Sequence, residues 1–207
     1  MNGVDDLIFS VSFTTRPPRG HEQPGVSYNY IDRNDFEERV ARGEFLEWAK
    51  VFDNYYGTHC SVLNLAREQG KDLVLDIDVQ GARQLRVKIP DAVSIFILAP
   101  SRNDLEQRLR LRSEDSQEVI DRRLREAADE IRNYGDYDYL IVNQSVEESA
   151  AVLSAIVLAE RARRAKGLAI PPETESEIRR AEQARLARME EKIRPILATF
   201  EQQQSEV

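Results

Sequence analysis

The sequence predicts an α/β protein with a parallel sheet, because short apolar segments alternate along it with charged segments of helical periodicity. The apolar segments are short and nearly continuous, as in strands that are buried on both faces, and lie at residues 7–12, 72–79, 92–99 and 139–142. The charged segments with a helical period lie at residues 103–112, 117–134 and 146–164. We therefore expect one sheet with helices on both faces.

Length, charge and cysteine content restrict the class of protein further. The 207 residues suffice for one substantial core with a small insertion or appendage. A net charge of −8 and an isoelectric point of about 5.0 provide no basic field, so we expect no nucleic-acid partner. No apolar segment approaches the roughly 20 residues that cross a bilayer and no secretory signal is apparent, which predicts a cytoplasmic protein without a membrane partner. The single cysteine, Cys60, excludes an internal disulfide, and no Cys/His spacing indicates a bound metal.

Residues 28–58 interrupt the alternation of strands and helices. Short aromatic stretches in this region flank one expected helix from Arg33 to Gly43, with Asn34 or Asp35 as candidate caps at its start and Gly43 at its end. Such a segment is typical of a small insertion with its own antiparallel strands at the edge of an α/β body.

The C-terminal part of the sequence predicts a linker followed by a helix. Residues 167–175 include two prolines and have no periodicity, whereas residues 176–207 form a charged amphipathic helical extension with apolar side chains at Ile178, Leu186, Met189, Ile193 and Leu197. Pro195 is expected to kink or end this helix. The helix either packs on its own chain or pairs with a second copy to form a homo-oligomer; recognition of a specific partner is the alternative.

The stretch SVSFTTRPPRG, residues 10–20, places Arg16 and Arg19 on either side of a Pro-Pro pair. Guanidinium groups bind phosphate through paired donors, and the prolines limit the freedom that the loop loses on binding. The alternative is a solvated turn in which the charges only keep the loop in water.

Two later stretches add candidates for base recognition. Glu47 lies beside Trp48, and NYYGT, residues 54–58, places two tyrosines and a threonine at a glycine turn. A carboxylate can accept two hydrogen bonds from the N1 and N2 edge of guanine, a pattern that adenine cannot supply. Asp76 and Asp78 follow at the end of an expected buried strand, where α/β proteins bind ligands. Core packing of the aromatic residues and helix capping by the carboxylates are the structural alternatives.

Six arginines lie within residues 108–125. Most are expected on solvated helix faces, but a mobile arginine segment between two helices can also close over phosphates and stabilise their charge. The arginines are Arg108, Arg110, Arg112, Arg122, Arg123 and Arg125.

Six stretches in order resemble the guanylate kinase family, over about residues 7–163: SVSFTTRPPRG, GEFLEWAKVFDNYYGT, LVLDIDVQGARQLR, PDAVSIFILAPS, DSQEVIDRRL and YDYLIVN. The resemblance implies transfer of the γ-phosphate of ATP to GMP, with ATP as co-substrate and Mg²⁺ as cofactor. It implies a parallel-sheet P-loop kinase core over residues 1–166, a GMP-binding subdomain at 28–58 and a helical lid at 102–125.

The resemblance also implies a role for individual residues. The GMP phosphate ligands would be Ser12, Arg16, Arg19, Tyr28 and Tyr56, and the guanine ligands would be Glu47, Thr58 and Asp78. Arg112 and Arg123 match lid arginines that reach the nucleotide phosphates and, with Arg16, form the implied catalytic set. The resemblance also assigns Arg112 and Asn143 to the ATP side, where Asn143 matches a residue near the adenine.

The sequence departs from the family pattern at two places. The lid usually reads R-G-R-G, whereas here residues 110–113 read RLRS, which removes two glycines that give hinge freedom. No stretch matches the P-loop pattern G-x-x-x-x-G-K-[ST], in which the main ligands of the ATP phosphates and of Mg²⁺ are expected. We expect the chain to be a shortened record of a longer gene product, with Met1 an internal methionine, and to have little kinase activity as given.

Two other classes of function compete with a kinase. A non-catalytic guanylate-kinase-like module that binds GMP or a peptide would not need the P-loop, but a peptide-binding module would not need the guanine ligands either. A coiled-coil adaptor built on the C-terminal helix would explain only the last part of the sequence.

Overall fold

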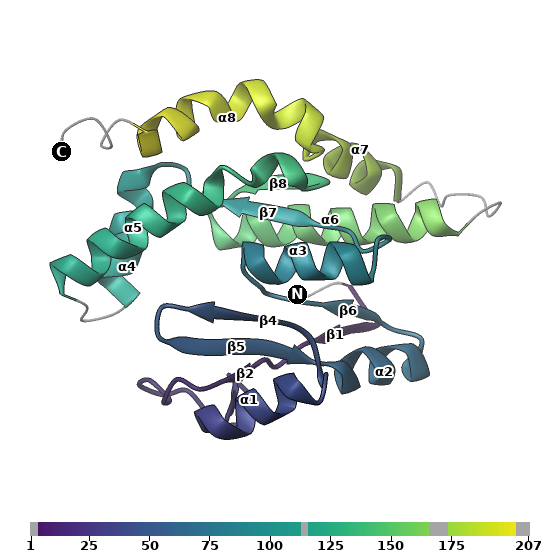
Figure 1. The fold of residues 1–207 in the computed structure, drawn as a ribbon. Coiled ribbons are helices and arrows are strands. Elements are labelled where there is room, and N and C mark those ends of the chain that lie inside the picture. Colours follow the sequence, from purple (N-terminus) through teal and green to yellow (C-terminus); the bar gives the residue numbers. More distant parts are fainter. Residues whose placement is uncertain (1–3, 113–115, 166–173, 202–207) are drawn as a thin grey trace. The chain divides into compact units, whose positions relative to one another are not determined.

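The computed structural model describes residues 4–112, 116–165 and 174–201, with the side chain of Arg112 outside this description. The chain divides into two compact units. We call Asp5–Ala92 the N-terminal unit, and Val93–Val207 together with Met1–Val4 the C-terminal unit. Each unit is described by itself below, with the element labels of Figure 1.

Two pairs of parallel strands confirm the expected α/β class. In the N-terminal unit, β1 (Leu7–Phe9) pairs with β6 (Asp72–Val74), and in the C-terminal unit, β7 (Ile95–Leu98) pairs with β8 (Tyr139–Val142). Within the described residues, the hydrogen-bonded ladders leave these as separate two-stranded sheets rather than the one sheet expected. β6 and β7 therefore each have one ladder partner in the part of the chain that the structure describes.

The strand expected at 72–79 is shorter than predicted. β6 ends at Val74, and Asp78 is the N-cap of α3 (Val79–Lys88), where its side chain accepts a hydrogen bond from Gly81 N at 2.9 Å. The prediction missed the helix start because the apolar run continues to Val79, so hydrophobicity alone does not mark the change from strand to helix. Asp78 thus has the capping role that was one of the two alternatives for it.

A four-stranded sheet forms the other part of the N-terminal unit. Its order is β3-β2-β5-β4, with β3 at Asn29–Tyr30, β2 at Phe13–Thr14, β5 at Asn54–His59 and β4 at Phe45–Val51. The expected antiparallel strands are confirmed in the β4–β5 hairpin. β3 instead pairs in parallel with β2, which precedes the segment 28–58 in the sequence.

Helix α1 (Arg33–Ala41) packs on this sheet through one aromatic side chain. Phe36 is fully buried, and its ring stacks on Phe45 and Tyr55 at centroid distances of 4.5 and 5.2 Å. The predicted caps Asn34 and Asp35 are wrong, because Asp32 is the N-cap and accepts from Asp35 N at 2.8 Å. The predicted end is confirmed, since Gly43 has a φ of 70° directly after the helix.

Helix α3 closes the open edge of β4. Gln84 donates to Trp48 O at 2.5 Å and accepts from Trp48 N at 3.2 Å, so its amide replaces a neighbouring strand. Lys88 Nζ donates to Leu46 O at 2.6 Å one turn further along. These contacts satisfy backbone groups that an edge strand would otherwise expose. Helix α2 (Cys60–Gln69) connects β5 to β6 and ends at Gly70.

In the C-terminal unit, β7 and β8 are joined by α4 (Arg102–Arg112), α5 (Gln117–Ile131) and the 3₁₀ helix η1 (Tyr134–Asp136). Helix α5 is three residues shorter than predicted, because the chain turns into η1. Helix α6 (Val146–Arg164) has the predicted bounds, and Ser145 caps its start by accepting from Glu148 N at 3.1 Å.

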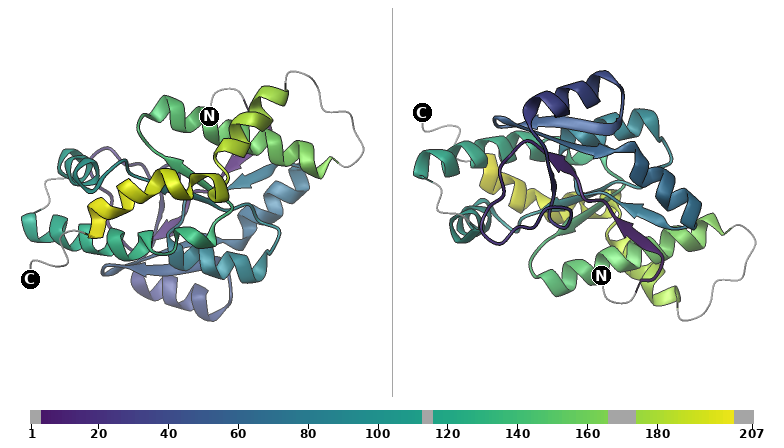
Figure 2. Two further views of the ribbon diagram at one scale, coloured as in Figure 1. Left: turned by 90° about the horizontal axis from the view of Figure 1, so that it is seen from above. Right: turned by 90° about the horizontal axis from the view of Figure 1, so that it is seen from below.

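Two helices replace the single C-terminal helix that the sequence predicts. They are α7 (Glu175–Gln183) and α8 (Leu186–Glu201), and Figure 2, left, shows the change of direction between them. The break lies where Ala184 O accepts from Leu140 N at 2.9 Å and Leu186 N donates to Asp138 O at 3.1 Å. These bonds, to β8 and to the residue before it, take backbone groups that a continuous helix would use internally. The expected linker, 167–175, lies mostly outside the described residues.

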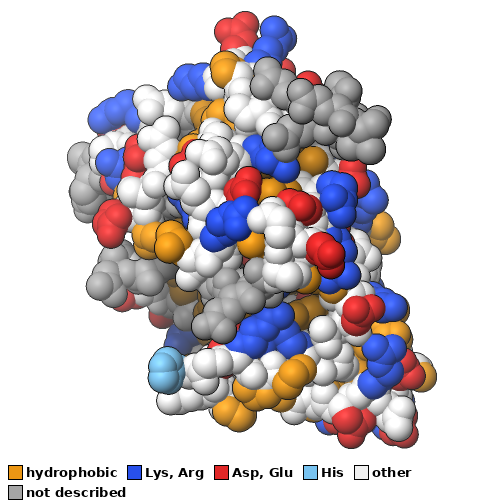
Figure 3. Space-filling view, turned by 90° about the vertical axis from the view of Figure 1, so that its left-hand side faces the viewer, with side chains coloured by type: hydrophobic (Ala, Val, Ile, Leu, Met, Phe, Trp, Pro, Cys, Tyr) orange, Lys and Arg blue, Asp and Glu red, His pale blue; other side chains and the backbone are white. Residues whose placement is uncertain are grey.

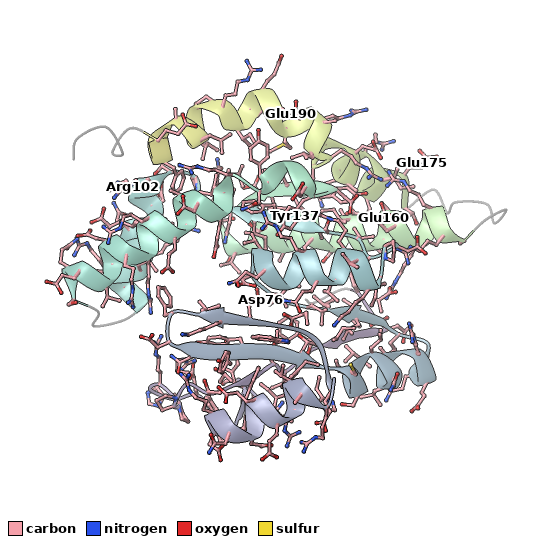
Figure 4. All side chains as sticks on the ribbon, in the orientation of Figure 1. Asp76, Arg102, Tyr137, Glu160, Glu175 and Glu190 are labelled. Carbon is pink, nitrogen blue, oxygen red and sulfur yellow. The ribbon has the colours of Figure 1, made fainter. Side chains whose placement is uncertain are left out.

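Pro195 lies inside α8 and does not end it. Ile193 is fully buried and Phe200 is 4% exposed, so contacts on both sides of the proline fasten the helix to the C-terminal unit. Figure 4 labels Arg102 at the start of α4, where its backbone N donates to Thr199 Oγ1 at 3.0 Å. The apolar face of α8 therefore packs on its own chain.

A buried tyrosine joins β8 to α6 and α7. Tyr139 is fully buried, and its hydroxyl donates to Glu160, which Figure 4 labels on α6, and accepts from Arg163 Nη1 at 2.8 Å. Burial, together with the bond to Glu160, raises the pKa of Tyr139. Arg185 Nη2 donates to Glu160 Oε1 at 3.0 Å, and its guanidinium lies 4.4 Å from the centre of the Tyr139 ring. This cluster fastens the start of α8 to the core.

The surface has mixed charge. On the face drawn in Figure 3, acidic and basic side chains are interspersed, as the composition predicts. Among the helices that the structure describes, none is both long and apolar enough to cross a membrane.

Candidate functional site

Arg16 is the centre of the first group of candidate residues. It follows β2, and its side chain is held inside the N-terminal unit with only 6% of the residue exposed. Glu22 accepts two hydrogen bonds from the guanidinium, from Nη1 and from Nη2, each at 2.9 Å. Burial by itself lowers the pKa of Arg16, but the bonds to Glu22 and Tyr56 outweigh it and raise the pKa above its ordinary value. Arg16 is therefore a permanent, oriented cation.

Tyrosines surround this cation. Tyr56 OH accepts from Arg16 Nε at 3.2 Å, and the guanidinium lies 5.3 Å from the centre of the Tyr28 ring. The Tyr28 and Tyr56 rings meet edge to face with centroids 5.9 Å apart. The structure thus brings together three of the residues that the sequence predicts for phosphate binding.

Arg19 and Ser12 lie on the same segment of chain but are held less tightly. Arg19 is exposed, and Arg19 N donates to Glu22 Oε2 at 2.8 Å. Ser12 is half-buried, and its carbonyl accepts from Asn29 N at 2.8 Å. Their side chains make no hydrogen bond within the described part of the chain, so they have donors available for a ligand.

Glu47 is a buried carboxylate on β4. It is 3% exposed, and burial raises the pKa of its carboxyl. Interactions with Thr58 lower this pKa in part, and the negative charge of Asp78 raises it further, so the net shift is upward. At Gly81 on α3, a Cβ would lie 2.4 Å from Glu47 Oε2, so any larger residue there would displace the carboxylate. The carboxylate of Glu47 therefore lies against the first turn of α3, next to the cap residue Asp78.

Thr58 completes this second group. It is directly opposite Glu47 in the β4–β5 ladder, so both side chains are on the same face of the hairpin. Thr58 is fully buried, and its hydroxyl lies close enough to the Glu47 carboxylate to lower the pKa of that group, but it does not form a hydrogen bond of good geometry within the described residues. A buried hydroxyl without a well-formed hydrogen bond is costly, and a polar ligand beside Glu47 would supply a better partner.

The predicted ATP-side residues lie in the C-terminal unit. Asn143 follows β8, and its side-chain oxygen accepts from Ser149 Oγ at 3.1 Å. Arg123 is half-buried on α5. The side chain of Arg112 and residues 113–115 of the expected lid lie outside the described residues. Of the other arginines on α4, Arg108 Nη2 donates to Asn143 O at 2.7 Å, which is a structural contact.

The structure contains no ready site for a divalent cation in its described segments. Within residues 4–111, 116–165 and 174–201, no group of three or more His, Cys, Asp or Glu side chains could hold a metal ion. Mg²⁺ is usually bound through substrate phosphates and only one or two carboxylates, so this finding concerns a dedicated protein site alone.

Sequence reasoning missed three residues that shape the site: Glu22, Tyr30 and Gly81. Tyr30 OH donates to Glu22 Oε2 at 2.8 Å, which joins β3 to the arginine loop. An acidic residue six positions after Arg16 is a signal that could have identified Glu22 as its partner, but Gly81 could be explained only by the position of Glu47 in space.

These features define a class of protein. The fold is mixed α/β, and one compact unit combines an oriented arginine, surrounding tyrosines and a buried carboxylate beside a buried hydroxyl. Such a site suits a ligand that has an anionic group at one end and hydrogen-bond donors at the other.

Comparisons with known proteins identify the family. The family model "Guanylate kinase" matches residues 3–160. Guanylate kinase from Alkalilimnicola ehrlichii is 50% identical over 157 residues, which are 76% of this chain and 77% of the relative. Guanylate kinase from Koribacter versatilis is 53% identical over 164 residues, 78% of this chain and 70% of the relative.

A solved structure is also similar. The crystal structure of guanylate kinase from Anaplasma phagocytophilum is 36% identical and superposes with a TM-score of 0.65 over 79% of each chain. The chain belongs to the guanylate kinase family, a family of ATP:GMP phosphotransferases. The family that the sequence resembles is thereby confirmed.

Proposed function

We propose that this chain binds GMP in its N-terminal unit and serves phosphoryl transfer from ATP to GMP, which gives ADP and GDP. The observation that carries the proposal is the buried Glu47 carboxylate beside the buried Thr58 hydroxyl, in the same unit as Arg16. An ionised Glu47 accepts from the N1 and N2 groups of guanine, which offsets the cost of its burial. Adenine lacks this pair of donors, so the same carboxylate would disfavour AMP.

The phosphate of GMP is assigned to the group around Arg16. Arg16 and Tyr56 supply oriented donors, and the exposed side chain of Arg19 adds a second positive charge. We assign Ser12 and Tyr28 to the same end of the ligand, and Thr58 and Asp78 to the guanine end with Glu47. Binding of the acceptor therefore requires only residues of the N-terminal unit.

The ATP side is assigned to residues of the C-terminal unit, with Arg112 and Arg123 as catalytic cations together with Arg16, and Asn143 near the adenine. ATP and Mg²⁺ are the co-substrate and cofactor of this proposal. Because the 207 residues contain no G-x-x-x-x-G-K-[ST] stretch, the backbone cradle and lysine that usually hold the ATP phosphates are not supplied by this chain. We therefore propose that the chain binds GMP well and transfers phosphoryl groups slowly.

The domain organisation belongs to the same proposal. Residues 1–166 form the guanylate kinase-like part, with the GMP-binding subdomain at 28–58 and the lid at 102–125, and residues 167–175 link it to the helical extension at 176–207. A non-catalytic binding module is disfavoured, because the relatives named above are all guanylate kinases.

A pair of measurements on the 207-residue chain tests the proposal. Its single tryptophan, Trp48, neighbours Glu47, so its fluorescence is expected to change as GMP is added. A coupled ADP-release assay with ATP and GMP is expected to show turnover far below the roughly 1 to 100 s⁻¹ typical of kinases. Turnover in the ordinary range would contradict the claim that this chain transfers phosphoryl groups slowly. The absence of any GMP binding would contradict the assignment of the acceptor site.

A further inference from the structure

Most donors of the Arg16 guanidinium already have partners. A guanidinium has five N–H groups in a fixed planar arrangement. Nε donates to Tyr56 OH at 3.2 Å, and Nη1 donates to Pro17 O at 2.7 Å and to Glu22 Oε2 at 2.9 Å. Nη2 donates to Glu22 Oε1 at 2.9 Å. One N–H, on Nη2, has no acceptor in the described part of the chain.

The remaining N–H lies on a particular edge of the guanidinium. Glu22 takes the end formed by Nη1 and Nη2, which leaves the side formed by Nε and Nη2. Tyr56 OH lies at this side and accepts from Nε, so its own hydrogen is available to donate, and no acceptor for it exists among the described residues. An anionic oxygen placed here would receive hydrogen bonds from both Arg16 and Tyr56.

Glu22 also fixes the loop that carries the second arginine. Besides Arg16, its Oε2 accepts from Arg19 N and from Tyr30 OH, each at 2.8 Å. Glu22 N donates back to Arg19 O at 3.0 Å, which closes the turn. The carboxylate thus has four donors from three residues, while the side chain of Arg19 remains exposed.

We propose that Glu22 is a positioning residue for phosphate recognition: it holds the Nη1–Nη2 end of Arg16 so that the opposite side of the guanidinium, with Tyr56 OH, faces the phosphate. This inference rests on the proposed GMP site and adds a residue to it. Glu22 does not itself contact the nucleotide. Its negative charge is not a competitor of the phosphate, because the two anions use different sides of the same cation.

The geometry favours positioning over competition. A phosphate that replaced Glu22 would have to break both bonds to Arg16 and leave a carboxylate facing Arg19 N and Tyr30 OH alone. A phosphate at the open side breaks at most the bond between Nε and Tyr56. Because Glu22 holds the Arg16 guanidinium in place before the ligand binds, less conformational freedom is lost on binding.

The test compares GMP with guanosine, which lacks the phosphate, in titrations of the full chain. Glu22→Gln keeps the size of the side chain but loses its charge and one acceptor oxygen. We expect about tenfold weaker GMP binding, the size of one charge-assisted hydrogen bond, and unchanged guanosine binding. Tyr30→Phe, which removes one donor to Glu22, is expected to give a smaller loss in the same direction.

Glu44→Gln is the matched control. Glu44 also accepts from arginine in the same unit, from Arg42 Nε at 2.7 Å, but is not linked to Arg16. It is expected to leave the ratio of GMP to guanosine affinity unchanged. Tighter GMP binding by Glu22→Gln would show competition and overturn the inference, and an equal loss for GMP and guanosine would show a merely structural role and also overturn it.

An NMR measurement without ligand gives a second readout. In the unaltered chain, the bidentate bond should slow rotation of the Arg16 guanidinium and give separate Nη proton signals, which Glu22→Gln should merge. Unchanged signals would contradict the positioning role. Failure of the unaltered chain to bind GMP would instead overturn the proposed function, so the two failures are distinguishable.

Discussion

Glu47 is the residue at which function and stability are most directly opposed. Its carboxylate is almost fully buried, and burial raises its pKa because the charged form loses hydration. Without a ligand, the nearby charge of Asp78 adds to this cost. Replacing such a group is expected to make the protein more stable and less able to bind its ligand.

Replacement of Glu47 by glutamine tests this opposition. In the folded protein, the pKa of Glu47 lies above its ordinary value of 4.5. Below pH 4.5 this carboxyl is neutral and its burial does not reduce the free energy of unfolding. That free energy falls as the pH rises through the raised pKa and the carboxyl ionises. Glu47→Gln should therefore unfold at higher urea concentration than the unaltered chain at pH 8 and show a smaller loss of stability between pH 4.5 and 8. An equal pH dependence in both chains would contradict the assignment.

Gly81 provides a test by steric exclusion. Gly81→Ala would place a Cβ 2.4 Å from Glu47 Oε2, so the carboxylate must move, and GMP affinity should fall by at least about tenfold. Gly135→Ala is the matched control, since a Cβ at Gly135 meets nothing within 4 Å. Isothermal titration of both variants with GMP measures the difference, and equal affinities would show that the position of Glu47 does not matter for binding.

The candidate site was predictable for residues whose type alone indicates their chemical role. Arg16, Glu47 and Thr58 are identified by residue type and by the family resemblance, and the structure shows each of them buried in one unit. Glu22 and Gly81 were not predicted, because their roles depend on which groups lie beside them in space. No periodicity or spacing in the sequence reports such neighbours.

Among the elements, prediction succeeded for the long helix α6 and failed at the start of α3, although both begin at a capping side chain. The bounds of α6 were predicted correctly, since Ser145 precedes a long apolar and charged period. The strand β6 was predicted too long, because the apolar run continues past its last residue into the irregular segment before α3. Local hydrophobicity reports burial but does not separate a short strand from the turn that follows it.

The two C-terminal helices show a second limit of prediction from sequence. The break between α7 and α8 arises from backbone hydrogen bonds to Leu140 N in β8 and to Asp138 O just before this strand. Pro195 was expected to kink or end the helix, and of these two outcomes the end is wrong, since α8 continues to Glu201 with Ile193 and Phe200 buried on either side. Tertiary contacts therefore decide both the break and the continuation.

Helix α8 is expected to contribute directly to the stability of the C-terminal unit. Ile193→Ala removes a fully buried side chain and should lower the free energy of unfolding by about 2 to 5 kcal/mol. Its neighbour Arg194 is exposed, and Arg194→Ala should change that free energy by less than about 0.5 kcal/mol. Urea denaturation followed by circular dichroism compares them, and similar midpoints for both variants would show that α8 does not belong to the core.

At the scale of the whole molecule, the proposed acceptor and donor residues are divided between the two units. All eight residues assigned to GMP lie in the N-terminal unit. This unit contains the β1–β6 pair, the four-stranded sheet and buried residues of its own. Asn143 and Arg123 lie in the C-terminal unit. Recognition of GMP should therefore not depend on a bound ATP.

Calorimetric titration of the 207-residue chain with GMP and, separately, with AMP tests the central claim most directly. The two nucleotides have the same charge and differ in the base, so only the guanine site around Glu47 can separate them. We predict that GMP binds at least about a hundredfold more tightly than AMP without ATP, because AMP leaves the buried carboxylate unpaired. Equal affinities for GMP and AMP would contradict the claim that this unit is a guanine-specific acceptor site.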